Sequence, residues 1–184
     1  SSDLVVVLTS GYNGSTTNGY LYFVNPRNGQ LLEKVSTVTA APGLAQTTAY
    51  IKDFTDGTAD AIYAGDLNGN LWRFDVTAAA SGSYAAPLKL ATVTNASGTA
   101  QPITTQPLVE IQPLTRKRYI MFGTGQLLDS SDIQLTAGQS FYAIIDGTST
   151  AFGTAAGLPT GKSYPLGRGD LTELSNASLI STSA

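Results

Sequence analysis

The sequence contains neither cysteine nor histidine. Without cysteine there is no disulfide framework and no thiol chemistry. Without histidine the chain lacks the commonest general base and the commonest ligand for transition metals. A Ser-His-Asp triad and the zinc-protease motifs are therefore excluded, which favours a protein that binds over one that catalyses a reaction.

Charge is also scarce, since Lys, Arg, Asp and Glu make up only 12% of the residues against a usual share of ~25%. The net charge is −3. The densest positive cluster is Arg116-Lys117-Arg118, which we interpret as a solvated turn between two apolar runs. Because nucleic-acid binding needs a basic patch or stripe, we expect no nucleic-acid partner.

Long hydrophobic runs are missing as well. A membrane-spanning helix needs ~18 or more apolar residues, whereas the longest runs here, such as residues 4–8, have the length of a strand. The chain begins Ser1-Ser2-Asp3 with no methionine. We interpret it as a mature or excised fragment from which a targeting segment could have been removed.

Three segments share one layout, in which an apolar strand ends near a glycine and a second apolar strand closes on Asp or Asn. The strand pairs are residues 5–11 with 20–25, 61–66 with 70–75, and 119–125 with 141–146. Their Val, Ile, Tyr, Phe and Trp content suits a pleated sheet, and Asn68-Gly69 is a strong hairpin signal. The closing residues Asn25, Asp75 and Asp146 lie 50 and 71 residues apart. A period near 50 with one insertion is typical of propeller blades.

We therefore predict an all-β fold of four-stranded antiparallel blades forming a partial β-propeller. Residues 31–35 and 87–93 would be edge strands, and residues 47–51 and 107–111 the first strands of following blades. The hairpin strands are apolar on both faces, so we expect both faces to be buried. Residues 1–150 would form the blades. Residues 151–184 are polar and glycine-rich, and would be partly disordered or part of the next blade.

The segment from Asp53 to Asp60 is the best chemical signal, with three carboxylates and a glycine between two predicted strands. Calcium loops use alternating oxygen ligands, one backbone carbonyl and a glycine at the sharp turn. The candidate ligands are Asp53, Asp56, the carbonyl of Thr58, and Asp60. The first two ligand positions of a standard loop fall on Lys52 and Phe54, which cannot bind calcium. The alternative is a polar turn whose Asp side chains cap backbone N–H groups.

A second motif is Arg168-Gly169-Asp170, which spells an integrin-recognition tripeptide in a predicted flexible tail after Pro165. Exposed Arg and Asp side chains on a glycine turn could bind a receptor carboxylate and a receptor metal. The tripeptide also arises often by chance, and coincidence is the interpretation that we favour.

Residues 63–75, Tyr-Ala-Gly-Asp-Leu-Asn-Gly-Asn-Leu-Trp-Arg-Phe-Asp, resemble the hallmark of the PilC/PilY family of type IV pilus biogenesis and tip-adhesin proteins. Further matches follow in order at residues 101–107, 122–128, 131–132, 139–142 and 168–171. The resemblance implies the C-terminal β-propeller of a large surface protein, secreted or in the outer membrane. That protein would support pilus assembly, oppose retraction and take part in adhesion. Its partners would be pilins or minor pilins and host surface receptors.

The same resemblance bears on the acidic segment and on the tripeptide. In several members a calcium loop just before the Tyr-Ala-Gly-Asp strand governs the switch between extension and retraction, and residues 53–60 lie at that place here. The family also tends to have an Arg-x-Asp-Leu segment where Arg168 to Leu171 lies, which favours a structural role for the tripeptide.

Two other functions fit parts of the sequence. Residues 22–32 resemble the repeat of quinoprotein-like propeller dehydrogenases, which are enzymes. A generic calcium-bearing integrin-type repeat adhesin would also explain an acidic loop among β blades. We rank the pilus-associated module first, the enzyme second and the generic adhesin third.

Overall fold

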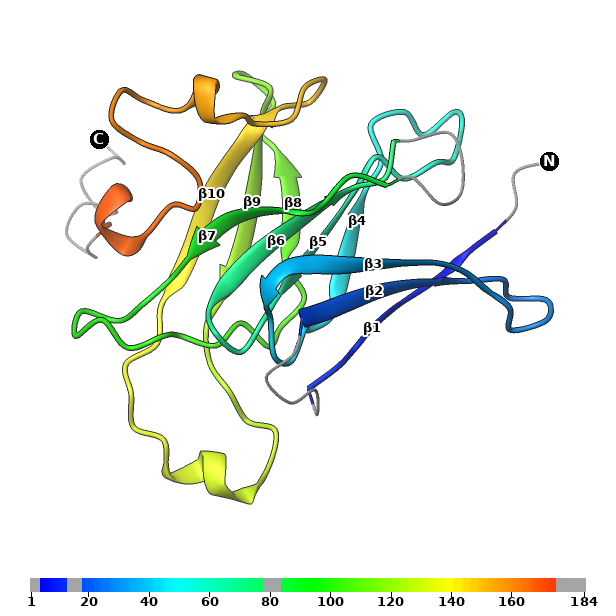
Figure 1. Cartoon of the computed structure of the whole chain (residues 1–184). Helices are drawn as coiled ribbons and strands as arrows, with labels where there is room; N and C mark the ends of the chain where they lie inside the picture. Colours follow the sequence, from blue (N-terminus) through cyan, green and yellow to red (C-terminus); the bar gives the residue numbers. More distant parts are fainter. Residues whose placement is uncertain (1–3, 13–17, 78–83, 175–184) are drawn as a thin grey trace.

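The computed structural model describes residues 4–12, 18–77 and 84–174. These residues form ten strands in three separate antiparallel sheets (Figure 1). Their helical segments are short 3₁₀ turns, and none of these is long and apolar enough to cross a membrane. The predicted all-β blade architecture, a partial propeller, is confirmed.

Each sheet is a meander whose strands are neighbours in the order of the chain. The first blade contains β1 (Val6–Thr9), β2 (Asn18–Val24) and β3 (Leu31–Ala40). The second contains β4 (Thr47–Tyr50), β5 (Ala61–Gly65), β6 (Asn70–Asp75) and β7 (Leu88–Thr92). The third contains β8 (Leu108–Ile111), β9 (Lys117–Gly123) and β10 (Phe141–Thr148). Among the described residues, only the second blade therefore has the four strands expected of each.

The predicted hairpin turn between β5 and β6 forms around a buried carboxylate. Asp66 accepts hydrogen bonds from the backbone N–H groups of Asn68 and Asn70, both at 2.9 Å. Gly69 follows with φ +74°, and a Cβ there would lie 2.6 Å from the carbonyl oxygen of Val93. Only glycine fits this position, because a side chain would be strained and would also collide with the backbone.

The second blade lies between the other two (Figure 1), and its inner strands β5 and β6 are buried on both faces. Its contact with the first blade contains Leu21, Phe23, Leu44, Trp72 and Phe74. Its contact with the third contains Tyr63, Leu71, Leu90, Ile120, Phe122 and Ile144. Burying large apolar side chains on both faces is the main stabilising contribution to this stack.

The outer blades are buried on one face only. Along β10, the side chains of Tyr142, Ile144 and Asp146 are buried while Phe141 and Ile145 are exposed. The expectation of two buried faces thus holds for β5 and β6 but is wrong for β1 and β10. The physical reason is that each outer sheet packs against a neighbouring blade on one side only.

The segment after β10 returns across the second and third blades. Phe152, Leu158 and Tyr164 pack against the core between these blades. Leu166 exchanges backbone hydrogen bonds with Leu90 and Thr92 and so continues the sheet beyond β7. Residues 175–184 lie outside the described residues, and the domain boundary at residue 150 stays a prediction.

The basic cluster at residues 116–118 is not a solvated turn throughout. Arg116 lies in the turn before β9, but Arg118 is only 1% exposed. Its guanidinium donates hydrogen bonds to the carbonyl oxygens of Thr148 (2.7 Å) and Ala151 (2.9 Å) and stacks on the ring of Tyr50. The alternation of side chains along β9 turns Arg118 inward, where two carbonyl oxygens accept hydrogen bonds from its guanidinium.

Candidate functional site

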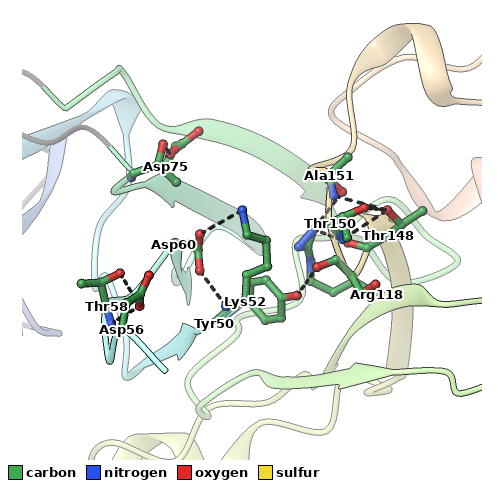
Figure 2. Close-up of polar contacts among 12 residues, drawn as sticks. Tyr50, Lys52, Asp56, Thr58, Asp60, Asp75, Arg118, Thr148, Thr150 and Ala151 are labelled. Atoms are coloured by element: carbon green, nitrogen blue, oxygen red, sulfur yellow. Dashed lines mark hydrogen bonds and ion pairs between the residues drawn. The ribbon is translucent and has the colours of Figure 1, made fainter. Parts of the chain in front are cut away.

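The acidic segment forms the loop between β4 and β5 and is anchored at Asp60 (Figure 2). The N–H of Asp60 donates to the carbonyl oxygen of Tyr50 at 2.8 Å, and its own carbonyl accepts from Val76 at 3.0 Å. The carboxylate turns back across the loop and accepts from the backbone N–H of Lys52 at 2.6 Å. The Lys52 Nζ lies 4.0 Å from the other carboxylate oxygen. Asp60 therefore closes the loop through Lys52.

The other two carboxylates of this loop each cap a turn of their own. Asp53 accepts from the N–H and the hydroxyl of Thr55, at 2.8 and 2.6 Å. Asp56 accepts from the N–H and the hydroxyl of Thr58, both at 2.8 Å. The Thr55 hydroxyl, and then its N–H, lowers the pKa of Asp53. These are the contacts of polar turns in which Asp side chains satisfy nearby donors.

Calcium needs several oxygens directed at one point. Within residues 4–12, 18–77 and 84–174, no three acidic side chains lie together so as to hold a metal ion. Asp53, Asp56 and Asp60 bind separate donors, and Phe54 is 82% exposed at the tip of the loop. The residues as arranged do not fit calcium, and calcium binding stays a prediction of the sequence.

The tripeptide Arg168-Gly169-Asp170 is the 3₁₀ turn η3 (Arg168–Asp170), and the expectation of a flexible tail is wrong for it. Asp170 accepts from the Lys162 ammonium and from the N–H of Gly167, both at 2.8 Å, and the Lys162 contact contributes most to the lowered pKa of Asp170. The Arg168 guanidinium donates to the hydroxyls of Ser140 and Tyr142 at 3.1 and 3.2 Å. Both charged side chains are thus engaged within the chain, and receptor binding by the tripeptide stays a prediction.

An open pocket of about 1050 Å³ lies beside η3. Its lining includes Asn95, Ser140, Phe141, Tyr142, Arg168 and Glu173. The Tyr142 hydroxyl also donates to the buried amide oxygen of Gln101 at 2.7 Å. Arg168 therefore lies at the end of an internal polar network that runs through Tyr142 to Gln101. This position agrees with the structural role that the family resemblance implies for Arg168.

A buried polar network between the second and third blades was not predicted. Asp146 is fully buried and pairs with the Arg73 guanidinium. It also accepts from the hydroxyl of Tyr63 at 2.7 Å and from the N–H of Gly153 at 2.9 Å. Burial, and then the charge of Asp146, raises the pKa of Tyr63. Side chains from β5, β6 and β10 meet here, so the network joins the two blades.

The sequence carried a partial signal for this network. Asp75 and Asp146 close equivalent hairpins, yet Asp75 caps the N–H and hydroxyl of Thr77 at the surface while Asp146 points into the interface. An arginine inside the apolar run of β6 was the other clue, because a buried Arg needs a carboxylate or several carbonyl oxygens. Neither clue identifies the partner, which lies 73 residues away.

The hallmark hairpin at residues 63–75 has a physical explanation. The Asp66 carboxylate also accepts from the indole N–H of Trp72 at 2.9 Å and from the side-chain amide of Asn70 at 2.8 Å. Burial raises the pKa of Asp66, and these donors oppose the shift. One carboxylate therefore fixes both the turn and the aromatic side chain packed against the first blade.

Comparisons with known proteins agree with this geometry. The sequence model of the protein family described as the PilY1 beta-propeller domain matches residues 2–96 of this chain. The type IV pilus biogenesis factor PilY1 homolog of Xylella fastidiosa is 36% identical over 141 residues, which cover 77% of this chain and 11% of that protein. The type IV pilus biogenesis factor PilY1 of Pseudomonas aeruginosa PAO1 is 31% identical over 165 residues, covering 77% of this chain and 14% of that protein.

A solved structure gives the same result. The crystal structure of the Pseudomonas aeruginosa PilY1 C-terminal domain superposes with a TM-score of 0.70 at 26% identity, covering 90% of this chain and 37% of that one. The chain thus spans only a small part of the length of its relatives. A sequence match over half of the chain, a relative above 30% identity and a shared blade architecture lead to one conclusion: this chain belongs to the PilY1 β-propeller family.

Proposed function

We propose that this chain is a non-catalytic module of a type IV pilus biogenesis factor, in which its blades support pilus extension and surface attachment. The observation that carries the proposal is the 36% identity over 77% of the chain to a protein named as such a factor. The whole protein would act at the bacterial cell surface in association with the pilus, either secreted or in the outer membrane. Its partners would be pilins or minor pilins and surface receptors.

The contacts of the buried carboxylates support a binding role. Asp66 holds a hairpin turn, and Asp146 holds the interface between two blades. Asp132, in η1 (Ser130–Gln134), accepts from the N–H of Leu128 at 2.6 Å and from the amide of Gln126 at 2.8 Å. These carboxylates are used in fixing the backbone, as in a rigid scaffold that presents loops to a partner.

The exposed apolar faces of the outer blades have a separate explanation. On the outer face of β1 the side chains of Val6 and Leu8 are exposed. On the outer face of β10 those of Phe141 and Ile145 are exposed. Blades need neighbours on both faces to bury such side chains. We assign these faces to further blades of the full-length protein, which leaves the loops and blade edges for pilus components.

The test is genetic and uses the full-length protein in its own bacterium. Deleting the gene should lower the pilin recovered from the cell surface by shearing, and should reduce attachment to surfaces. Full-length protein should restore both, whereas the same protein without residues 4–174 should not. Unchanged surface pilin after deletion would contradict the proposal. A quinone absorbance after reconstitution with quinone and calcium would instead favour the dehydrogenase alternative.

A further inference from the structure

The β4–β5 loop keeps the backbone turn of a calcium loop while its first ligand positions have changed. Aligned on Gly57, the ligand positions fall on residues 52, 54, 56, 58 and 60. Gly57 has φ +67°, the left-handed conformation that the sharp turn of such a loop requires. The first two positions hold Lys52 and Phe54, which offer no side-chain oxygen.

Lys52 contacts the carboxylate at the last of these positions in two ways. Its backbone N–H donates to one oxygen of Asp60 at 2.6 Å, and its ammonium lies 4.0 Å from the other (Figure 2). The Asp60 side chain is 16% exposed and that of Lys52 is 49% exposed, so the carboxylate is the more shielded partner. A positive charge therefore already faces the carboxylate that a calcium ion would need.

The remaining carboxylates of the loop need no metal to satisfy them. Asp56, the third ligand position, accepts from both donors of Thr58, and Asp53 accepts from both donors of Thr55. A calcium ion would have to displace these contacts and would also approach the Lys52 ammonium. Like charges within a few Å repel, which opposes binding of a second cation.

We propose that Lys52 takes the place of a bound cation, so that the β4–β5 loop of this chain closes without calcium. The loop would then hold one conformation at all calcium concentrations. This inference rests on the contacts of Lys52 and Asp60 and is independent of the proposed pilus function.

The experiment is a calcium titration of the whole chain, read by calorimetry and by melting temperature. The wild type should bind no calcium at millimolar concentration, and its melting temperature should not change. Lys52→Asp combined with Phe54→Asn restores an oxygen at each changed position. This variant should gain calcium binding and melt about 5 °C or more higher when calcium exceeds its Kd a hundredfold.

Lys52→Met with Phe54 unchanged is the matched control, because it removes the charge without adding an oxygen. It should melt about 1–3 °C lower than the wild type, since the Lys52 side chain is half exposed, and calcium should not restore the loss. Calcium binding by the wild type that disappears in Asp60→Asn would overturn the proposal. A folded double variant that fails to respond to calcium would overturn it too, because Lys52 and Phe54 would then not be what excludes the ion.

Discussion

Replacing Asp146 by alanine should destabilise the chain severely, because this carboxylate is the centre of the network between the second and third blades. It is fully buried and accepts hydrogen bonds from Arg73, Tyr63 and Gly153. Its removal leaves the Arg73 guanidinium, whose side chain is 9% exposed, without its carboxylate partner. Breaking a buried ion pair in this way costs about 3–5 kcal/mol. Against a typical stability of about 5–15 kcal/mol, such a loss brings the chain close to unfolding.

Two further variants separate the contributions to this loss. Tyr63→Phe removes one hydrogen bond to the charged group and should cost about 1.5–3 kcal/mol. Arg73→Met combined with Asp146→Leu removes both charges of this buried pair, so neither is left without its partner. It should cost less than Asp146→Ala alone, although it removes both partners.

Urea unfolding measures these differences, provided that the slope of the free energy against urea stays constant among the variants. Lys162→Ala, which breaks the more exposed pair with Asp170, is the reference and should cost about 1 kcal/mol or less. If Asp146→Ala lowers the free energy of unfolding no more than Lys162→Ala does, the assigned role of the network between blades is refuted.

Three other outcomes follow from the structure. Gly69→Ala should lower the free energy of unfolding in urea by more than about 2 kcal/mol, because the added Cβ would lie 2.6 Å from the Val93 carbonyl oxygen. Gly29→Ala is the control, because Gly29 has a similar φ but open space around it, and it should lower the same quantity by only about 1–2 kcal/mol. Leu71→Ala should cost about 2–5 kcal/mol in the same assay, since Leu71 is fully buried in β6. Burial raises the pKa of Tyr164 from 10.0 to about 12. The protonated Tyr164 hydroxyl therefore contributes its full share of stability below pH 10, and this share is lost as the pH rises through 12. Tyrosinate absorbance during alkaline unfolding should show the loss. Tyr164→Phe should remove this part of the pH dependence.

Much of the fold could be predicted because its signals are local. The apolar hairpins, the Asn68-Gly69 turn and the strand at residues 88–92 follow from patterns within a few residues of each other. The burial of each face does not, because it depends on which blade lies next to which. The β10 side chains of Phe141 and Tyr142 belong to the same apolar run, yet one is exposed and the other buried.

The polar contacts were harder to predict for the same reason. Arg118 lies in a basic cluster that resembles a surface turn, but its partners are carbonyl oxygens about thirty residues further along the chain. The three carboxylates and the glycine in residues 53–60 were enough to predict an acidic loop. The contact between Lys52 and Asp60 could not be predicted, because it depends on how the loop closes. Composition identifies which residues carry charge, and only the packing determines which opposite charge each one meets.

The proposed function of these stacked blades is to support pilus assembly within a larger protein. Its most direct test is the amount of pilin sheared from cells whose full-length protein carries Asp146→Ala, Tyr63→Phe or Lys162→Ala. Surface pilin should follow the stability of the blades, falling several-fold for Asp146→Ala and staying near the wild-type amount for Lys162→Ala. Wild-type surface pilin in the Asp146→Ala strain, with the blades shown to be destabilised, would contradict the account.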